Sequence, residues 1–435
     1  MASATDDLIS SVRLDDGAFY VDNPYPVYAR LRSEAPVLWY EPGQCWLVSR
    51  YADVKSVSGN DALYSAQYGF ATYDNFNVLG RLRRSIPEAA GQLERGEITA
   101  HEARRILKTV AEGVGSRNMT LSDPPLHTEL RRLTNLRLSR KRIELLAKQI
   151  REITITALDS VPAGEPVDLV QLLAAPIPLA VIAELMGIPE EDRADFRRWS
   201  DSMIEIIDAT DPDRIATLQG DLDEARSYFR QELQRRRAEP RDDMLSDIAN
   251  GTVEGEPLQL PAQVRYATLM LSAGNETTRN LFSGGVKALM DYPEQLRLLQ
   301  ADESLVPLAV DELLRWTTPV NATGRTALEP AELEGQQIAV GDYIVMLYQS
   351  ANRDERVWDR PGTLNIARKP IPMHEAFGTG QHVCLGQHVA RFEARIMFEE
   401  TFRRFRSVEP AGDPVWSNST HVNGLAALPV IFQAA

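Results

Sequence analysis

Two cysteines, Cys45 and Cys384, occur in the chain, and the second lies in a run whose residue types could do chemistry, HEAFGTGQHVCLGQHVARFEAR (residues 374–395). Glycines flank Cys384 on both sides, and three histidines lie within about ten residues of it. Thiolates and imidazoles bind metals and act as nucleophiles, and a glycine-rich turn before a helix can bind an anion. The run could therefore form a metal site, a phosphate loop or a nucleophilic centre, or it could hold an ordinary buried thiol.

None of these four alternatives fits the sequence fully. A phosphate loop of the form G-x-G-x-x-G fails because Val383 stands where the third glycine belongs. A nucleophile needs a base and an orienting partner, and the sequence singles out neither. A buried cysteine leaves the flanking glycines unexplained. A zinc site lacks the paired C-x-x-C spacing of structural zinc, although it could draw on His374, His382, Cys384 and His388.

A further interpretation is a thiolate that binds the metal of a large, flat cofactor. Gly378, Gly380 and Gly386 remove side chains where the backbone must approach a ligand face or turn sharply. A predicted helix over residues 385–405 begins directly after Cys384. Its free N–H groups and its dipole would stabilise an anionic sulfur and would temper the electron donation of a metal-bound thiolate.

The run resembles the haem-binding loop of the cytochromes P450, whose pattern is Phe-Gly-x-Gly-x-x-x-Cys-x-Gly. The matching residues are Phe377, Gly378, Gly380, Cys384 and Gly386. The resemblance implies that Cys384 is the proximal ligand of the iron of haem b, with Phe377 beside the sulfur. It also implies that His382 bonds a haem propionate, as a histidine at this place does in many bacterial members.

A second motif is LMLSAGNETTRN (residues 269–280), which alone is an amphipathic helix with an awkward glycine and two β-branched threonines. It resembles the family's distal-helix motif, Ala-Gly-x-acid-Thr, through Ala273, Gly274, Glu276 and Thr277. The resemblance implies that the small residues leave room for dioxygen and that Gly274 weakens the helix so that water can enter. It also implies that Glu276 relays protons and that Thr277 hydrogen-bonds the bound oxygen.

Three further segments resemble motifs of the family and occur in the same order along the chain. The resemblance as a whole extends from about Asn23 to Phe432. DELLRW (311–316) carries Glu312 and Arg315, which alone would be a surface ion pair. In the family this Glu-x-x-Arg pair supports the haem loop, and its third partner is expected from Arg353, Arg356 or Arg360. The other two segments, LSDPPLHTELRRL (121–133) and NATGRTAL (321–328), supply the expected propionate-binding residues His127, Arg131 and Arg325.

The elements that position these residues are predicted to be mainly helical, with a minor β region (α+β). Helical periodicity dominates residues 140–300, and strand-like runs occur near residue 40 and after about residue 322. The resemblance implies the P450 fold, a triangular helical prism with small sheets, as a single domain over residues 1–435. The charged stretch 77–118 is either a solvated helix pair or a lid over the distal pocket.

Composition limits the class of protein. The 435 residues carry a net charge of −15 and are 43% hydrophobic, which is ordinary for a globular protein and argues against nucleic acid as a partner. The polar, acidic start resembles neither a signal peptide nor an anchor. The most apolar run, residues 169–188, contains Pro176 and Pro178 and is predicted to be a core helix rather than a membrane span. We expect a cytoplasmic protein.

The resemblance implies a monooxygenase that uses O2 and inserts one oxygen atom into a C–H bond. Glu276 and Thr277 argue against the remote alternative, a haem-thiolate sensor or carrier without turnover. We expect no fused reductase, so electrons from NAD(P)H would come through ferredoxin reductase and ferredoxin. Residues 131–142 hold six basic and no acidic residues. We predict that the partner docks there, on Arg137, Arg140, Lys141 and Arg142.

The substrate pocket is inferred from family position. Besides Ala273 it comprises Leu269, Met270, Val320, Asn321, Thr323, Val422 and Asn423. Such a wall is apolar with a few hydrogen-bonding groups, which favours a lipophilic substrate. A steroid, terpenoid or branched lipid is the favoured class, and polyketide or macrolide tailoring is the alternative.

Overall fold

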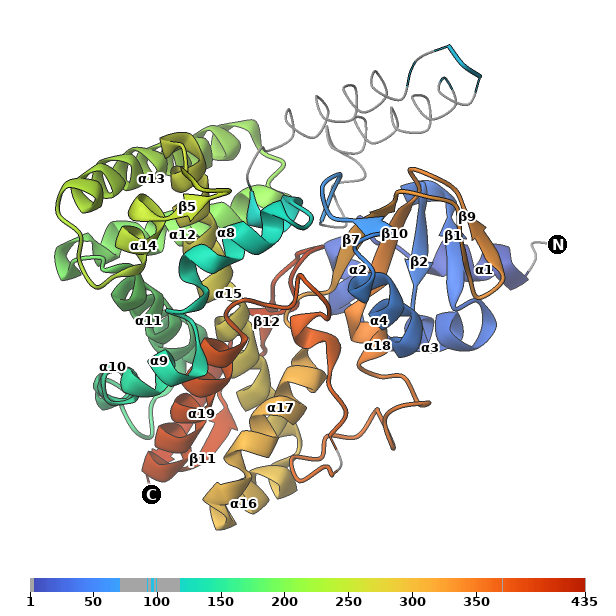
Figure 1. Cartoon of the computed structure of the whole chain (residues 1–435). Helices are drawn as coiled ribbons and strands as arrows, with labels where there is room; N and C mark the ends of the chain where they lie inside the picture. The colour runs from blue at the N-terminus through green and yellow to red at the C-terminus, as the bar shows by residue number, and fades with distance from the viewer. Residues whose placement is uncertain are drawn as a thin grey trace.

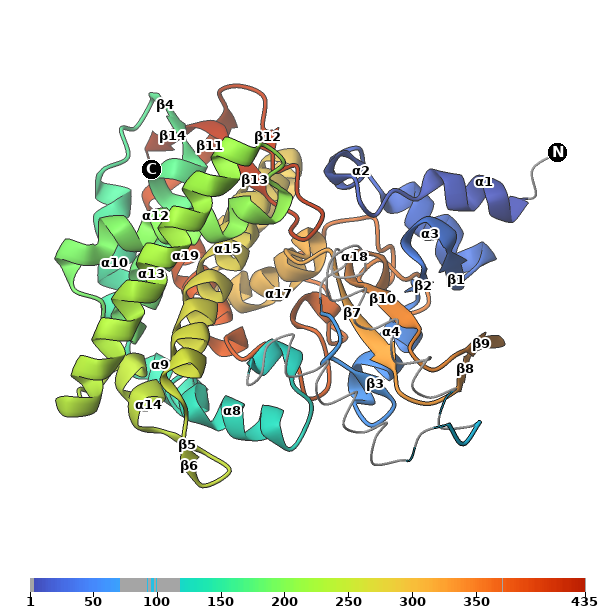
Figure 2. The same cartoon turned by 90° about the horizontal axis from the view of Figure 1, so that it is seen from above.

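The computed structural model of the chain describes residues 4–70, 118–369 and 371–434, together with Gln92, residues 95–97 and Thr99. The stretch 77–118, predicted to be a helix pair or a lid, lies outside these described residues except for the few just named. In the described part, the helical and strand-rich regions lie side by side (Figures 1 and 2). The described chain begins beside the main sheet and ends in the helical region.

Most of the described chain is helical, as the sequence predicts. The helices are α1 (Ala4–Ser11), α2 (Gly17–Val21), α3 (Tyr25–Glu34), α4 (Tyr51–Gly59), α8 (Leu126–Asn135), α9 (Arg140–Leu145), α10 (Ala147–Asp159), α11 (Pro176–Met186), α12 (Arg193–Asp208), α13 (Pro212–Ala238), α14 (Met244–Asn250), α15 (Leu260–Asp291), α16 (Pro293–Ala301), α17 (Val306–Thr317), α18 (Tyr348–Ala351) and α19 (Gln387–Arg404). Helix α19 therefore begins three residues after Cys384, close to the predicted start.

The strands form one five-stranded sheet and several smaller ones. The main sheet has the order β1 (Val37–Tyr40), β2 (Cys45–Val48), β10 (Tyr343–Leu347), β7 (Ala322–Ala327), β3 (Tyr64–Ser65), and only the β2–β10 pair is parallel. A three-stranded sheet has the order β11 (Phe405–Pro410), β14 (Pro429–Ala434), β4 (Pro166–Asp168). Two-stranded pairs are β12 (Val415–Trp416) with β13 (Leu425–Ala427), β5 (Thr252–Val253) with β6 (Glu256–Pro257), and β8 (Ala331–Leu333) with β9 (Gln336–Ile338).

Helix α15 passes through the helical region and packs on α11, α12, α13, α17 and α19 (Figure 1). Its first half places Val264, Ala267 and Leu271 in one apolar cluster, and its second half places Phe282 and Leu289 in another. The residues between these halves, 272–280, are small or polar. The two clusters therefore hold both ends of the helix and leave its middle next to a cavity.

The apolar run 169–188 is part of this core. It forms a π-helical turn (Val170–Ala174) and then α11, which begins at Pro176. Pro176 fits the first turn of a helix because the N–H that proline lacks has no partner there. In the part of the chain that the structure describes, no helix is long and apolar enough to cross a membrane.

A buried ion cluster joins α17 to the segment that precedes the cysteine loop. Glu312 accepts hydrogen bonds from Arg315 at 2.8 and 2.9 Å and from Arg368 at 3.0 and 3.2 Å. Burial alone would raise the pKa of Glu312, but these two arginines hold it below its ordinary value. The third partner is therefore Arg368.

The expectation that the third partner would be Arg353, Arg356 or Arg360 was wrong. Arg353 stacks on the rings of Trp316 and Tyr25, and Arg356 pairs with acidic neighbours in its own loop. Arg360 pairs with Asp359 and is largely exposed. Sequence spacing did not separate these arginines because only the folded loop shows which guanidinium reaches Glu312.

Candidate functional site

The cysteine loop follows a short turn, η7 (Glu375–Phe377), and leads into α19. Gly378 and Gly380 have φ values of +65° and +77°, a region that disfavours residues with a Cβ. A Cβ at Gly380 would also lie 2.4 Å from the backbone oxygen of Ser58 in α4. Gly386 has a φ of −84°, which is open to any residue, and a Cβ there would lie 4.0 Å from the sulfur of Cys384.

Cys384 is held by the backbone of this loop. Its N–H donates to the carbonyl of Phe377 at 2.9 Å, and the N–H of Gly386 hydrogen-bonds to its sulfur. Burial raises the pKa of the thiol, while the Gly386 N–H and the charges of Arg131 and Arg391 act in the opposite direction. A group that binds the sulfur as a thiolate would find these donors and charges already in place.

Cys384 lines a cavity of about 380 Å³, and most of the sequence-predicted site residues line the same cavity. From the predicted cofactor set these are His127, Arg131, Arg325, Phe377, Gly378, His382, Cys384 and Gly386. From the distal motif they are Ala273, Gly274, Glu276 and Thr277. From the predicted substrate pocket they are Leu269, Met270, Val320, Thr323 and Val422.

Two predicted pocket residues do not line this cavity. The amide of Asn321 donates to the backbone oxygens of Ser419 and Thr420 and accepts from Gln349 at 2.9 Å. The amide of Asn423 donates to the backbone oxygen of Thr317. Both side chains therefore hold turns together, and the expectation that they contact substrate does not agree with this structure.

Four basic side chains gather at one end of the cavity. The rings of His127 and His382 lie 4.1 Å apart, and Arg131 donates to the backbone oxygen of Val383 at 2.6 Å. Arg325, on β7, donates to the backbone oxygen of Gly324. Within the described ranges, none of the four forms an ion pair with a carboxylate.

The electrostatics of this basic cluster favour an anionic ligand. Burial, with the charges of Arg131 and Arg325, lowers the pKa of His127 to about 4. Burial, with Arg325 and the other cationic neighbours, lowers the pKa of His382 to about 2. Nδ1 of His127 and Nε2 of His382 are buried without a hydrogen-bond partner. A ligand with two carboxylates would supply the missing acceptors, so the residues present fit a haem whose propionates lie here.

The zinc alternative is not supported. Among the described residues, no three side chains of His, Cys, Asp or Glu come together as a metal site. His374 instead bonds Asp311, and His388 lies exposed on α19. Of the three histidines near Cys384, only His382 faces the cavity.

The distal motif forms the middle of α15. Ala273 and Thr277 lie one turn apart, and the Thr277 hydroxyl donates to the Ala273 carbonyl at 3.2 Å. The helix is continuous from Leu260 to Asp291, so it is not broken at Gly274. A Cβ at Gly274 would lie 3.2 Å from the side chain of Ile182 on α11. In this structure the glycine therefore allows close helix packing, and no opening for water is seen.

Glu276 is buried on the same turn. Its carboxylate accepts from Arg279 at 2.6 Å and from Asn280 at 3.1 Å. Burial raises its pKa in spite of these two donors. Arg279 also lies 3.7 Å from Asp201 on α12, whose side chain is 46% exposed. A line of ionisable groups therefore leads from the cavity toward the surface, as a proton relay requires.

Glu393 was missed at the sequence level. It lies on α19, lines the cavity and is 1% exposed, and its Oε1 has no hydrogen-bond partner. Burial raises its pKa to about 8. The sequence signal for Glu393 would have been a glutamate on an otherwise apolar face of the helix. The several charged residues that surround it in the sequence hide that signal.

We expect Glu393→Gln to stabilise the protein relative to the parent, increasingly so as pH rises from about 5 to 8. In this window the folded parent keeps a proton on Glu393 that the unfolded chain has released, so its free energy of unfolding falls by about 1.4 kcal/mol per pH unit. The glutamine side chain does not titrate, so the free energy of unfolding of the variant lacks this dependence on pH. Thermal unfolding of both proteins at several pH values measures it, and a pH-independent difference in Tm would contradict the assignment.

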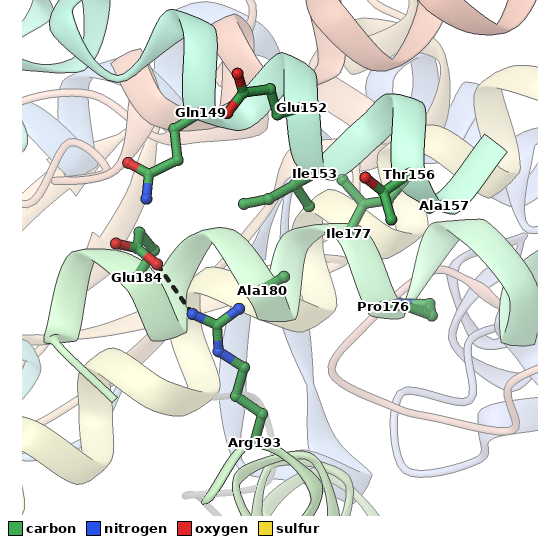
Figure 3. Close-up of a pocket in the computed structure, with 10 residues that line it drawn as sticks. All are labelled: Gln149, Glu152, Ile153, Thr156, Ala157, Pro176, Ile177, Ala180, Glu184 and Arg193. Atoms are coloured by element: carbon green, nitrogen blue, oxygen red, sulfur yellow. Dashed lines mark hydrogen bonds and ion pairs between the residues drawn. The ribbon is translucent and has the colours of Figure 1, made fainter. Parts of the chain in front are cut away.

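A second cavity, of about 440 Å³, lies between α10 and α11 (Figure 3). An ion pair between Glu184 and Arg193 borders it at 2.9 Å. None of the residues that the sequence marks for chemistry lines this cavity, and it contains neither cysteine nor histidine. The site that the sequence predicts is therefore the first cavity.

Together, a cysteine in a glycine loop, a basic anion-binding cluster and an acid–threonine pair on the long helix define the site of a haem-thiolate protein. Comparison with known proteins agrees. A sequence model described as Cytochrome P450 matches residues 87–433. The chain is 33% identical to linalool 8-monooxygenase of Pseudomonas putida over 415 residues, covering 94% of this chain and 95% of that enzyme.

Two further relatives lead to the same conclusion. The chain is 32% identical to the polyketide biosynthesis cytochrome P450 PksS of Bacillus subtilis, covering 95% of this chain and 97% of that protein. The crystal structure of CYP109E1 from Bacillus megaterium in complex with testosterone matches with a TM-score of 0.76 at 30% identity, covering 94% of this chain and 99% of that one. The chain belongs to the cytochrome P450 family and is a haem-dependent monooxygenase.

Proposed function

We propose that this monooxygenase hydroxylates a lipophilic substrate of the size of a terpenoid or a steroid. The observation that carries the proposal is the apolar wall of the cavity that also contains Cys384 and Thr277. Leu269, Met270 and Val422 belong to this wall, and α12 adds Met203 and Ile204. An apolar wall of this kind suits binding by burial of apolar surface.

The relatives support the same class of substrate. One acts on linalool, a terpenoid, and one solved neighbour holds testosterone, a steroid. PksS, which belongs to polyketide biosynthesis, keeps polyketide or macrolide tailoring as the second candidate. The family assignment leaves no support for a haem-thiolate sensor or carrier without turnover.

We propose residue roles that the geometry supports. Cys384 would bind the haem iron, and His127, Arg131, Arg325 and His382 would hold the propionates. The bound haem supplies the activation of O2. The apolar wall orients the substrate and excludes water, which limits side reactions. Glu276 would carry protons inward, and the Thr277 hydroxyl would hydrogen-bond the oxygen to be protonated.

A titration of the purified holoprotein tests the substrate class. Binding in the cavity displaces distal water, so a steroid or terpenoid is expected to shift the spin state of the ferric haem. Ala273→Leu, which adds bulk beside Thr277, is expected to weaken steroid binding more than linalool binding. A shift with macrolides alone would favour the second candidate. If no member of the three classes gave a shift, the proposed class would be wrong.

We also propose that electrons from NAD(P)H arrive through a ferredoxin reductase and an acidic ferredoxin. The predicted docking residues lie beside the cysteine loop, because Arg131 of α8 bonds Val383 and α9 packs on α19. Arg140 pairs with Glu144 at 2.9 Å but is 81% exposed, and Lys141 is also exposed. Arg142 pairs with Asp242, and its side chain is 37% exposed.

Arg137 does not fit the docking prediction. Its side chain is only 11% exposed, and it pairs with Asp242 and Asp247 from the loop and helix beyond α13. Its charge is already neutralised within the fold. The sequence count of six basic residues therefore overstated the charge that this surface presents.

Electron-transfer kinetics test the docking proposal. Arg140→Gln with Lys141→Gln is expected to slow reduction by ferredoxin at low salt and to make the rate less dependent on ionic strength. Lys148→Gln, which removes an exposed charge of the same sign on α10, is the control. An unchanged rate and salt dependence in the double variant would refute the assignment.

We further propose that the protein works in the cytoplasm as a single domain over residues 1–435, with residues 77–118 as an insertion over the distal pocket. The acidic composition and the position of this stretch between the sheet region and α8 support the proposal. Limited proteolysis with and without substrate tests the insertion, because a lid that closes over substrate would become protected.

A further inference from the structure

An ion cluster lies behind the cysteine loop, between α17 and α19. Nε of Arg391, on α19, donates to Oδ1 of Asp311, on α17, at 2.8 Å. The same oxygen lies 3.2 Å from Nε2 of His374, just before the loop. Both Arg391 and Asp311 are about one-third exposed, while His374 is buried. The proposed haem, proton and substrate roles use none of these residues.

The cluster reaches the cysteine through Phe377. The guanidinium carbon of Arg391 lies 4.4 Å from the centre of the Phe377 ring, and the His374 ring centre lies 5.6 Å from it. The carbonyl of Phe377 accepts the N–H of Cys384 at 2.9 Å. The Arg391 guanidinium is thus packed on the aromatic residue that holds the cysteine backbone, an arrangement that fixes its position.

The charge of Arg391 acts on the sulfur, and Asp311 partly cancels it. The guanidinium of Arg391 packs on Phe377, whose carbonyl accepts the Cys384 N–H, so its positive charge lies close to the sulfur. Burial alone would raise the pKa of Asp311, but the hydrogen bond from His374 and the charge of Arg391 hold it below its ordinary value, so it is ionised at neutral pH. Burial lowers the pKa of His374, which leaves its ring neutral. Beside the charge of Arg131, the sulfur therefore experiences one positive and one negative charge from this cluster.

We propose that the Arg391–Asp311 pair sets the reduction potential of the haem bound at Cys384, with Phe377 holding Arg391 in position. The inference rests on the proposed ligation of haem iron by Cys384. Reduction adds one electron, supplied by the redox partner, to the haem and its thiolate. A nearby positive charge favours the reduced state, and a nearby negative charge opposes it. The two members of the pair therefore act in opposite directions, as tuning rather than catalytic residues.

Potentiometry of two variants tests the proposal. Arg391→Gln removes the cation and is expected to lower the potential. Asp311→Asn removes the anion and is expected to raise it. We expect about a tenfold change in the reduction equilibrium for each, which corresponds to about 59 mV for one electron. Shifts of the reduction potential in opposite directions are the decisive result, because a structural disturbance of the loop would not be expected to reverse its effect between the two variants.

Two controls sharpen the measurement. Arg395→Gln removes the same charge one turn further along α19, where the arginine pairs with Glu399 at 2.6 Å and is half exposed. The reduction equilibrium of this variant is expected to change by less than about twofold, because the added distance and the solvent screen the charge. Arg391→Lys keeps the charge and is expected to stay nearer the parent than Arg391→Gln, which provides a folded comparison if the glutamine variant is unstable.

The possible failures can be told apart. The spectrum of the reduced carbon-monoxide complex reports thiolate ligation separately from the potential. If that spectrum lacks the thiolate type in the parent protein, the proposed ligand is wrong. If the spectrum is of the thiolate type but both variants shift the potential in the same direction, or by no more than Arg395→Gln, the tuning role is overturned while the ligand stands.

Discussion

Replacing Cys384 with serine is expected to abolish the thiolate-type spectrum of the reduced carbon-monoxide complex and to remove monooxygenase activity. Cys384 lines the cavity, the Gly386 N–H bonds to its sulfur, and two arginine charges lie nearby. A serine hydroxyl at the same place is a far weaker ligand and does not donate electron density as a thiolate does. Difference spectroscopy of the reduced holoprotein, with haem content measured separately, gives the result.

Cys45→Ser is the matched control for this substitution. Cys45 begins β2, is 2% exposed and lies opposite Tyr40 in the main sheet, away from the cavity residues. The control variant is expected to keep the thiolate-type spectrum, with at most a loss of stability of about 1–3 kcal/mol from burying a hydroxyl. A thiolate-type spectrum in Cys384→Ser, or its loss in Cys45→Ser, would contradict the assignment of the ligand.

Replacing Thr277 with alanine is expected to separate electron consumption from product formation. The hydroxyl of Thr277 borders the cavity one turn from Ala273, so it is placed to hydrogen-bond oxygen there. Without it, O2 would accept two electrons and two protons and leave as hydrogen peroxide. General acid–base contributions of this kind are typically about 10²-fold or more, so product formed per NAD(P)H consumed should fall by roughly that factor.

Thr268→Ala provides a strict comparison on the same helix. The hydroxyl of Thr268 donates to the Val264 carbonyl at 2.8 Å, the same type of bond that Thr277 makes, but Thr268 does not line the cavity. It is expected to keep full coupling. Thr277→Ser retains a hydroxyl and is expected to recover most of the product yield. Equal coupling in Thr277→Ala and the parent would remove Thr277 from the proposed proton path.

The main parts of the site were predictable because their chemistry depends on residues close together in the chain. Gly378 and Gly380 occur where the backbone takes positive φ, and Cys384 follows, three residues before α19 begins. Glu276 and Thr277 share one turn of α15. Local backbone geometry sets how residues at such short spacings are arranged, so their arrangement does not depend on how distant elements pack.

Residues whose role depends on distant partners were predicted less well. Arg368 was overlooked among four arginines of one loop, although it alone of the four bonds Glu312 directly. Arg137 was counted as a surface charge, but acids more than a hundred residues away neutralise it. Asn321 was assigned to the substrate pocket, but its amide bonds the turn at residues 419–420.

The sequence by itself predicted the cysteine loop, the acid–threonine pair, the basic residues that line the same cavity, and a mainly helical fold with small sheets. Only the tertiary structure decided that Gly274 packs on Ile182 within an unbroken helix, that Glu393 is a buried carboxyl on the cavity wall, and that Arg391 meets Asp311 behind the cysteine. The physical reason is the same in each case. A motif records which groups are present at short range, whereas burial and charge pairing depend on which elements pack together.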